Sequence, residues 1–429
     1  MTTTLLNCEV LLSQEIGDYW EGTSTSATSS VTIVDTSLLA KTDNWITDFS
    51  YDMLTSGSYN EEERKISTSS SVSTGSLTVL AHGGSIASGV TYRVHRLFEP
   101  SEKRRALISA TKEIFGECYD MVWNESLVSG NWLRDGSFER WTTGTDLTDW
   151  SESVIVPAQT ATNGLFKHGG YSACLAGTAG TLTQGYTENS DLRQLAGKTV
   201  SFTLQGHCNV GSCLRIAVYD GSTQTFSDYH EGGTDWTPDT DPLKVQATIN
   251  STPTEVTFKV CHDDANGTSY VDDGRVISGY RNRTYSGHLG LAQNEPNEIF
   301  IEPAQYSREE PWISIHDWEV DEDGYLYLPT SVSNDYRLRV VGKQYLDFIS
   351  SGTVSTSWSA TINLNEPQTR ILTAQAAVYL YTWMSMPNYE SGTREDYQEM
   401  VGFWKQEVKE RKAKFGMPSL PVTTSWGFE

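Results

Sequence analysis

The stretch NWLRDGSFERW (residues 131–141) decides how this chain is divided. Asp135 and Gly136 form a turn dipeptide, Ser-Phe-Glu then alternates as a strand does, and Trp132 and Trp141 stand on either side. A glycine turn before an alternating run is typical of the start of a β-sheet domain. A domain that starts here has another region of the chain in front of it.

The residues after this stretch continue in the same pattern as far as residue 273. Segments such as TVSFTLQGH, LRIAVYD and EVTFKVCHD alternate polar and apolar residues between glycine turns, and the region closes on TSYVDDGRV. Alternation with a period of two indicates half-buried strands. Residues 131–273 are therefore predicted to form an all-β module.

The flanking regions mix helices with short strands. The apolar spacing predicts a helix within residues 1–20 and another over 101–119, with short β segments over 30–98 between them. Strands are expected again in ISIHDWEV, DGYLYLP and YRLRVVGKQYL. The fold class is predicted as multidomain α+β, a helical bundle and small β segments with an inserted all-β sandwich.

Two amphipathic helices are expected at the end of the chain, one from Asn365-Glu366-Pro367 and one from Thr393. The second carries a single apolar stripe with Trp404 at its centre. The stripe consists of Tyr397, Met400, Val401, Trp404 and Val408. We expect the two helices to form a hairpin that completes a small bundle with the 101–119 helix.

The charge limits the class of partner. The chain has 31 Lys and Arg against 55 Asp and Glu, a net charge of −24. Such a surface repels phosphate backbones, which excludes a protein that binds DNA and reads its sequence. It suits the wall of a channel through which DNA passes without binding. On the 101–119 helix, Lys103, Arg104 and Arg105 form a basic cluster. It is either a solvated face or a contact for an acidic partner surface.

Targeting signals and cysteine spacing point to synthesis in the cytoplasm. No run approaches the ~20 apolar residues of a membrane helix, and the N-terminal segment contains Glu9, Glu15 and Asp18 without a basic leader. No cysteine pair has CxxC spacing, so reduced thiols are expected, although Cys208 and Cys213 are close enough in sequence to pair. We expect no membrane insertion.

The flanks resemble the head-to-tail adaptor (neck, or connector) proteins of tailed bacteriophages. TIVDTSLL, SGSYNEEERKIS, GVTYRVH, LTAQAAVYLYTWM and GFWKQEVKERKAKFG carry the resemblance, which covers roughly residues 1–120 and 300–429. It implies a virion protein that forms an oligomeric ring, a dodecamer in the family. The ring would join the portal to the tail proteins and let DNA pass without specific binding. Lys103, Arg104, Arg105 and Trp404 are the candidate protein interface.

The middle resembles a different family, the carbohydrate-binding jelly rolls, through RDGSFERW at its start and SYVDD at its end. The predicted domains are therefore an N-terminal adaptor segment (1–125), an inserted jelly roll (126–278) and a C-terminal adaptor segment (279–429). The resemblance also implies a structural calcium ion beside the first and last strands. Its candidate ligands are Asp135, Glu139 and Asp272.

Sugar binding requires aromatic faces with polar neighbours, and four aromatic residues lie in such contexts. These residues are Trp141, Trp150, Tyr229 and Trp236. Each of them is also compatible with a place in the core.

The sequence carries no catalytic signature. No pair of carboxylates stands out as a glycosidase pair, and the sequence has neither HExxH nor a nucleophile elbow. The aspartates of DWEVDEDGYLY (317–327) lack the spacing of an EF-hand, so a hairpin turn is expected there. No enzyme activity and no cofactor other than the calcium ion are expected.

The expected function is a neck adaptor ring with an outward jelly roll that binds surface glycans. Two alternatives stay open, a tail-fibre or receptor-binding protein that binds host carbohydrate and a secreted glycan-active enzyme. The protein is expected in the virion, at the neck or tail, after synthesis in the host cytoplasm.

Overall fold

The computed structural model describes residues 2–67, 72–305, 311–350, 352–386 and 394–417. The chain forms two compact units, one from Met1–Asp120 with Tyr345–Ser419 and one built on Met121–Gln344. They are called unit 1 and unit 2 below, and each is described by itself. Strands make up 33% of the structure and helices 22%, so β-sheet is the main regular structure of the protein. The fold class is therefore not that of a helical bundle.

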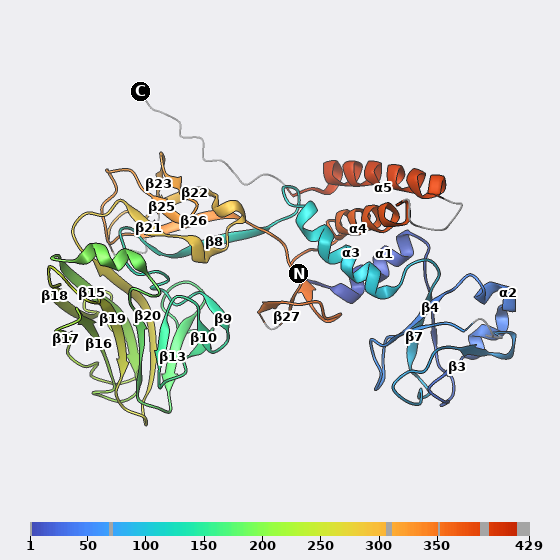
Figure 1. The fold of residues 1–429 in the computed structure, drawn as a ribbon, viewed down its shortest axis with the longest axis horizontal. Coiled ribbons are helices and arrows are strands. Elements are labelled where there is room, and N and C mark those ends of the chain that lie inside the picture. The colour runs from blue at the N-terminus through green and yellow to red at the C-terminus, as the bar shows by residue number, and fades with distance from the viewer. Residues whose placement is uncertain (1, 68–71, 306–310, 351, 387–393, 418–429) are drawn as a thin grey trace. The chain divides into compact units, whose positions relative to one another are not determined.

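Unit 2 contains a sandwich of two antiparallel five-stranded sheets (Figure 1). Sheet one has the order β11 (Ser151–Ser153), β14 (Gly180–Gln184), β19 (Thr257–His262), β16 (Leu214–Tyr219) and β17 (Gln224–Phe226). Sheet two has the order β12 (Ala158–Thr160), β13 (Ser172–Ala176), β20 (Thr268–Ile277), β15 (Thr199–Cys208) and β18 (Leu243–Thr248). Neighbouring strands come from distant stretches of the sequence, which is the strand order of a jelly roll.

The alternation seen in the sequence fills the space between the two sheets. Leu182 and Ile216 both lie opposite Val260 in sheet one and are completely buried. From the two facing sheets, Phe202 and Phe258 meet edge to face with their ring centroids 5.4 Å apart. The sandwich thus has a single hydrophobic core between its sheets.

The entry and exit of the sandwich lie side by side. The side-chain amide of Asn131 donates to the Gly274 carbonyl at 2.9 Å, and its oxygen accepts from the Val276 amide at 2.8 Å. The Trp132 amide donates to the Val276 carbonyl at 3.0 Å. The first residues of NWLRDGSFERW are therefore held on the last strand of the same sandwich.

The rest of unit 2 contains two smaller sheets and a short hairpin. The four-stranded sheet has the order β23 (Ile313–Ile315), β22 (Pro296–Ile301), β26 (Arg337–Gln344) and β8 (Asp120–Val128). The three-stranded sheet has the order β21 (Arg283–Tyr285), β25 (Tyr325–Tyr327) and β24 (Glu319–Val320). The hairpin joins β9 (Trp141–Thr143) to β10 (Asp146–Leu147). The two small sheets share a second core.

A buried cluster of charges connects the sandwich to β26. Asp273 bonds to Arg275 at 2.6 Å and to His168 at 3.3 Å, and Arg337 contacts the His168 ring at 2.5 Å. Arg275 also reaches Asp335 at 3.0 Å. Burial alone raises the pKa of Asp273, but the Arg275 guanidinium and His168 hold it well below its usual range. Each charge in this cluster therefore depends on the others to remain buried.

In the part of unit 1 that the structure describes, four helices share one core, and α2 (Asp43–Ile46) adds a single turn. They are α1 (Leu5–Glu15), α3 (Pro100–Glu113), α4 (Thr369–Met384) and α5 (Arg394–Phe415). The N-terminus of α3 is fixed by a capping box of Glu99 and Glu102 with Pro100 in the first turn. In α5, Glu395 and Asp396 lie in the first turn and lysines in the last, which suits the helix dipole.

Unit 1 also contains three small sheets. One has the order β2 (Trp20–Thr23), β7 (Thr91–His95), β4 (Tyr51–Leu54) and β5 (Glu63–Lys65). Another pairs β3 (Thr32–Val34) with β6 (Ser76–Thr78). The last has the order β1 (Thr3–Thr4), β29 (Thr361–Ile362), β27 (Ile349–Ser350) and β28 (Thr353–Val354). Chain segments from both sides of unit 2 in the sequence thus build one unit.

Some sequence predictions differ from the structure in detail. The compact units place residues 279–344 with the sandwich, whereas the predicted domains place them with the flanks. The helix expected over 101–119 spans Pro100–Glu113 and is capped by Glu99. Thr393, the expected start of the last helix, lies outside the described residues. All six cysteines are free thiols, Cys208 and Cys213 included.

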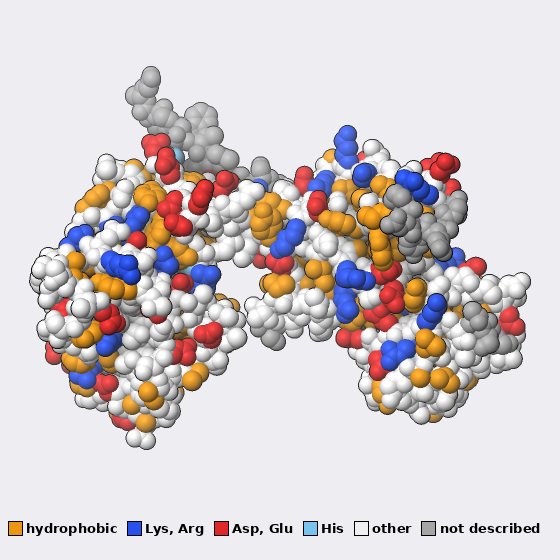
Figure 2. All heavy atoms as spheres, in the orientation of Figure 1, with side chains coloured by type: hydrophobic (Ala, Val, Ile, Leu, Met, Phe, Trp, Pro, Cys, Tyr) orange, Lys and Arg blue, Asp and Glu red, His pale blue; other side chains and the backbone are white. Residues whose placement is uncertain are grey.

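The surface charge is spread over both units. Figure 2 shows Lys and Arg side chains interspersed with Asp and Glu side chains on the visible face of each unit. Among the described residues, no helix has the length and apolar character needed to span a membrane.

Candidate functional site

A groove of about 510 Å³ lies along the segment that leads from β17 into β18. Two of the four aromatic residues singled out in the sequence, Tyr229 and Trp236, line it together. The other lining residues are mostly polar: Asp228, His230, Glu231, Gly232, Asp235, Thr237, Pro238, Asp241, Pro242, Leu243 and Lys244. We call this feature the 228–244 groove.

Trp236 is held firmly at the wall of the groove. It forms an isolated antiparallel bridge with His207, and its indole nitrogen donates to the Gly164 carbonyl at 2.9 Å. The His207 ring lies between Trp236 and Tyr270, with centroid distances of 5.7 and 5.3 Å. The three rings form a row on the outer face of sheet two, and Trp236 remains partly exposed.

The backbone beside Trp236 is fixed by a second set of polar contacts. The Thr237 hydroxyl donates to Gln205 at 2.7 Å and accepts from the Gly206 amide at 3.1 Å. The Lys167 ammonium reaches Asp239 at 2.9 Å and the Thr237 carbonyl at 3.1 Å. The wall of the groove is therefore formed before any ligand binds, which lowers the entropic cost of binding.

Tyr229 lies at the edge of sheet one and is 36% exposed. Its hydroxyl donates to Asp263 at 2.9 Å. The Arg215 guanidinium lies over the Phe226 ring at 3.9 Å and over the Tyr229 ring at 4.5 Å. The ring is thus oriented by cation–π and hydrogen-bond contacts rather than by burial.

The groove is acidic. Four carboxylates line it, against one lysine, Lys244. Burial lowers the pKa of His230, which leaves that imidazole neutral at neutral pH. Partly exposed aromatic rings beside carboxylate acceptors can stack on the C–H faces of a sugar and accept hydrogen bonds from its hydroxyls.

Trp141 and Trp150 do not belong to the groove. Trp150 is 4% exposed, stacks on Phe138 at 5.0 Å, and donates to the Asp135 carbonyl. Trp141 is partly buried against the same core and donates to the Phe138 carbonyl at 2.8 Å. Burial removes Trp150 as a ligand platform, because Phe138 and the Asp135 carbonyl enclose its indole. Trp141 lies outside the 228–244 groove, and its role as a ligand platform stays a prediction.

The three carboxylates proposed as calcium ligands are engaged with backbone amides. Asp135 accepts from the amides of Glu139 and Arg140, and Asp272 accepts from those of Lys167 and His168. The Glu139 carboxylate accepts from the Gly170 and Tyr171 amides. Within the described ranges, no group of three or more His, Cys, Asp or Glu side chains is arranged to hold a metal ion.

These carboxylates nevertheless affect one another. Burial raises the pKa of Glu139 to about 8, and the nearby charge of Asp135 adds to the shift. Burial likewise raises the pKa of Asp135 to about 6 and that of Asp272 well above its usual range, with Glu139 contributing to the latter. A cation would relieve this repulsion, and the calcium ion remains a prediction.

The basic cluster on α3 is not a surface feature as a whole. Lys103 is completely buried, and its ammonium bonds to Asp18, Ser13 and His95, each at 2.8 Å. Arg104 packs over the Trp358 ring at 5.0 Å, and Arg105 is exposed. The prediction that Lys103 forms an external contact was therefore wrong, because its helix position faces the core.

Trp404 is likewise an internal residue. Its side chain is 3% exposed within the core of unit 1, and the Arg411 guanidinium lies 5.6 Å from its ring. Burial removes it from the candidate partner surface of this chain.

The DWEVDEDGYLY segment forms the β24–β25 hairpin, where Asp321 accepts from the Tyr325 amide at 2.8 Å.

Sequence reasoning missed His207, Tyr270, Gln205 and Lys167 in the support of the groove. In TVSFTLQGH, the polar Gln205 and His207 alternate with apolar residues, so a period-two reading places them on the outer face. That signal was present in the sequence. Nothing local indicates that a tryptophan 29 positions away pairs with His207, because the contact depends on the fold.

Comparison with protein families found no matching family, and comparison with curated proteins found no relative. Three of the solved structures that match cover about one third of the chain each. A carbohydrate-binding module, TmCBM61, in complex with β-1,4-galactotriose is 14% identical and covers 34% of this chain and 98% of its own, with a TM-score of 0.26. The C-terminal family 22 carbohydrate-binding module of Clostridium thermocellum Xyn10B is 19% identical and covers 35% and 93%, with a TM-score of 0.26.

The enzymatically active domain of bacteriophage CBA120 tailspike protein 4 is 11% identical and covers 35% of this chain and 21% of its own, with a TM-score of 0.26. These matched structures are carbohydrate-binding modules and a phage tailspike, and none is a head-to-tail adaptor. At these TM-scores, the jelly roll is identified by its own strand order rather than by the matches.

Proposed function

We propose that this chain is a glycan-binding protein of a phage tail and that the 228–244 groove binds a neutral oligosaccharide. The observation that carries the proposal is Trp236, an aromatic ring left partly exposed at the wall of a preformed groove by contacts to His207 and Gly164. Because the ring is already held in place, a sugar can stack on its face with little entropic cost for ordering the Trp236 side chain.

The charge of the groove selects the class of sugar. Its four carboxylates accept hydrogen bonds from hydroxyl groups but repel uronate and sialate carboxylates, and Lys244 alone offsets them. The overall charge of −24 acts in the same direction at long range. Neutral glycans are therefore favoured over acidic ones.

The wider roles belong to the same proposal and are supported by sequence resemblance alone. Virion location at the tail or neck, assembly into a ring and contact with the portal come from the flanking motifs described above. The absence of catalysis is also a prediction. In this scheme the sandwich supplies attachment to surface glycan and the flanking segments supply incorporation into the particle.

The test is binding of the full chain to neutral oligosaccharides, measured by isothermal titration calorimetry. β-1,4-Galactotriose and a xylo-oligosaccharide serve as neutral probes, and an oligogalacturonate serves as the acidic probe. Trp236→Ala should weaken neutral binding about tenfold or more, a loss of ~1.4 kcal/mol or more. Trp123→Ala removes an equally large ring that is 55% exposed in β8 and should leave binding unchanged.

Two results would contradict the proposal. Tighter binding of the uronate probe than of the neutral probes would refute the role given to the acidic groove. Equal affinities for the wild-type protein and Trp236→Ala would place any glycan site elsewhere.

A further inference from the structure

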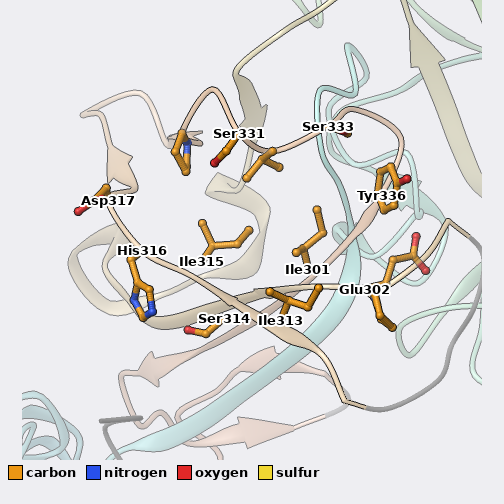
Figure 3. A pocket seen from close by; sticks show the side chains of 13 residues that line it. Ile301, Glu302, Ile313, Ser314, Ile315, His316, Asp317, Ser331, Ser333 and Tyr336 are labelled. Carbon is orange, nitrogen blue, oxygen red and sulfur yellow. The ribbon is translucent and has the colours of Figure 1, made fainter. Parts of the chain in front are cut away.

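A second pocket, of about 510 Å³, lies in the small β-sheets of unit 2, outside the sandwich (Figure 3). Its lining comes from β22, β23 and the segment 329–336. In Figure 3, Glu302 and Tyr336 lie at one end, His316 and Asp317 at the other, and the isoleucines of the two strands between them. This pocket shares no residue with the 228–244 groove.

The pocket is preformed. Ile301 pairs with Ile313 across β22 and β23, which fixes the apolar floor. The opposite wall is tied to the neighbouring chain segment, because the Ser129 hydroxyl donates to the Ser333 carbonyl at 2.7 Å and accepts from the Tyr336 amide at 3.1 Å. Ile313 is 54% exposed, so this apolar floor is open to a ligand.

One carboxylate in the pocket has an unsatisfied oxygen. Glu302 is only 2% exposed, and its Oε1 accepts from the Arg337 amide at 2.8 Å. Its Oε2 is buried and has no hydrogen-bond partner among the residues that the structure describes. A buried carboxylate oxygen without a donor is costly, and a ligand that brings a donor recovers that cost.

The charges around the pocket are of one sign. Glu302 and Asp317 are both among its lining residues, and no described Lys or Arg is. A cationic group would thus meet attraction without a competing positive charge from this lining, and it would supply the donor that Oε2 lacks. An apolar stem is needed as well, to lie along Ile301 and Ile313.

We propose that this pocket receives a basic side chain, lysine or arginine, presented by a polypeptide partner. The aliphatic stem would lie on the isoleucines and the cationic head would bond to Glu302 Oε2. Long basic side chains bury their methylene stems while keeping the charge on a polar group, which matches this combination of surfaces. The proposal gives unit 2 a protein-binding site that is independent of glycan binding.

The test uses two small probes that differ only in the charged head. N-acetyl-L-lysine methylamide carries the ammonium, and N-acetyl-L-norleucine methylamide has the same main stem without it. In NMR titrations of the full chain, the lysine probe should bind about tenfold more tightly than the norleucine probe, and added salt should reduce the difference.

Variants locate the effect. Glu302→Gln keeps an acceptor for the Arg337 amide but removes the charge, so lysine binding should fall about tenfold while norleucine binding stays the same. Glu319→Gln changes an exposed carboxylate in β24 and should affect neither probe. Ile313→Ser shortens the apolar floor and should weaken both probes.

Three outcomes would overturn the proposal. The first is equal affinity of the protein for both probes. The second is an equal loss of lysine-probe affinity in Glu302→Gln and Glu319→Gln. The third is no detectable binding of the lysine probe at about 10 mM, which would mean a dissociation constant too weak for a specific site. Glycan titrations with Trp236→Ala are unaffected by any of these outcomes, so the two sites can be judged separately.

Discussion

Replacing Lys103 with methionine tests the buried charges of unit 1. The ammonium lies 2.8 Å from Asp18, Ser13 and His95, and 3.8 Å from Glu9, in a region where all these side chains are nearly or completely buried. Methionine preserves the stem and removes the charge. Asp18 and Glu9 are then left as buried anions with one cation fewer.

The loss of stability in Lys103→Met depends on the hydrogen bonds that Asp18 keeps. Breaking a buried ion pair by removing one partner costs ~3–5 kcal/mol. Asp18 keeps three backbone donors, the amides of Arg96, Leu97 and Phe98, which places the expected loss near ~3 kcal/mol. For a unit of this size, each kcal/mol shifts Tm by roughly 2–4 °C, so we expect a fall of about 6–12 °C.

The assay is differential scanning calorimetry of the full chain, with urea unfolding as a second measure. Arg105→Met is the matched control, because Arg105 lies on the same helix and is exposed. Its Tm should stay within about 1 °C of the wild-type value, as for most surface substitutions. If Lys103→Met unfolds at the same temperature as Arg105→Met, the stabilising role of the buried ion network around α3 is refuted.

Two further predictions concern the last helix and the acidic cluster. Trp404→Ala should lower the stability of unit 1 by ~3–5 kcal/mol in urea unfolding, whereas Lys405→Ala, on the exposed side of α5, should change it little. Glu139 has a folded-state pKa of about 8, above its ordinary value, so the protonated native form is favoured at low pH. The stability that this group contributes is present below its ordinary pKa and is lost as the pH rises through about 8. The Tm of the unit 2 transition should fall between pH 5 and 9, and Glu139→Gln should flatten that fall. Millimolar calcium should reduce the fall in the wild-type protein, and an unchanged pH profile with calcium would exclude the predicted ion.

Local sequence signals were sufficient for the elements that are stabilised locally. The turn at Asp135-Gly136, the capping residues around Pro100 and the charge gradient of α5 each act within a few positions, and the structure has a turn or helix at each place. Lys103 shows the limit of such signals. It stands one helical turn before Leu107, on the apolar face, but the acids that stabilise it lie about 85 and 94 positions earlier.

The same limit applies to the candidate site. A partly exposed tryptophan and a buried one have the same sequence context when both follow polar turns, as Trp236 and Trp150 do. Their difference arises from what packs against them. Trp150 is enclosed by Phe138 and the Asp135 carbonyl, whereas Trp236 contacts the His207 ring and the Gly164 carbonyl and stays partly exposed. The Glu302 oxygen without a donor among the described residues also cannot be found in the sequence, because it depends on which groups the fold brings near it.

The charge cluster of Asp273, Arg275, His168 and Arg337 restricts how this chain can be recombined. If the proposed glycan site is correct, exchange of the sandwich alone would be the simplest way to change its specificity, with the adjoining ends at Asn131 and Val276 as the points of exchange. A graft cut there would remove the contacts of the buried Arg337 with Asp273 and His168. We therefore expect a recombinant that keeps these contacts to carry β26 along with the sandwich, so that the unit of exchange is Met121–Gln344 rather than the sandwich alone.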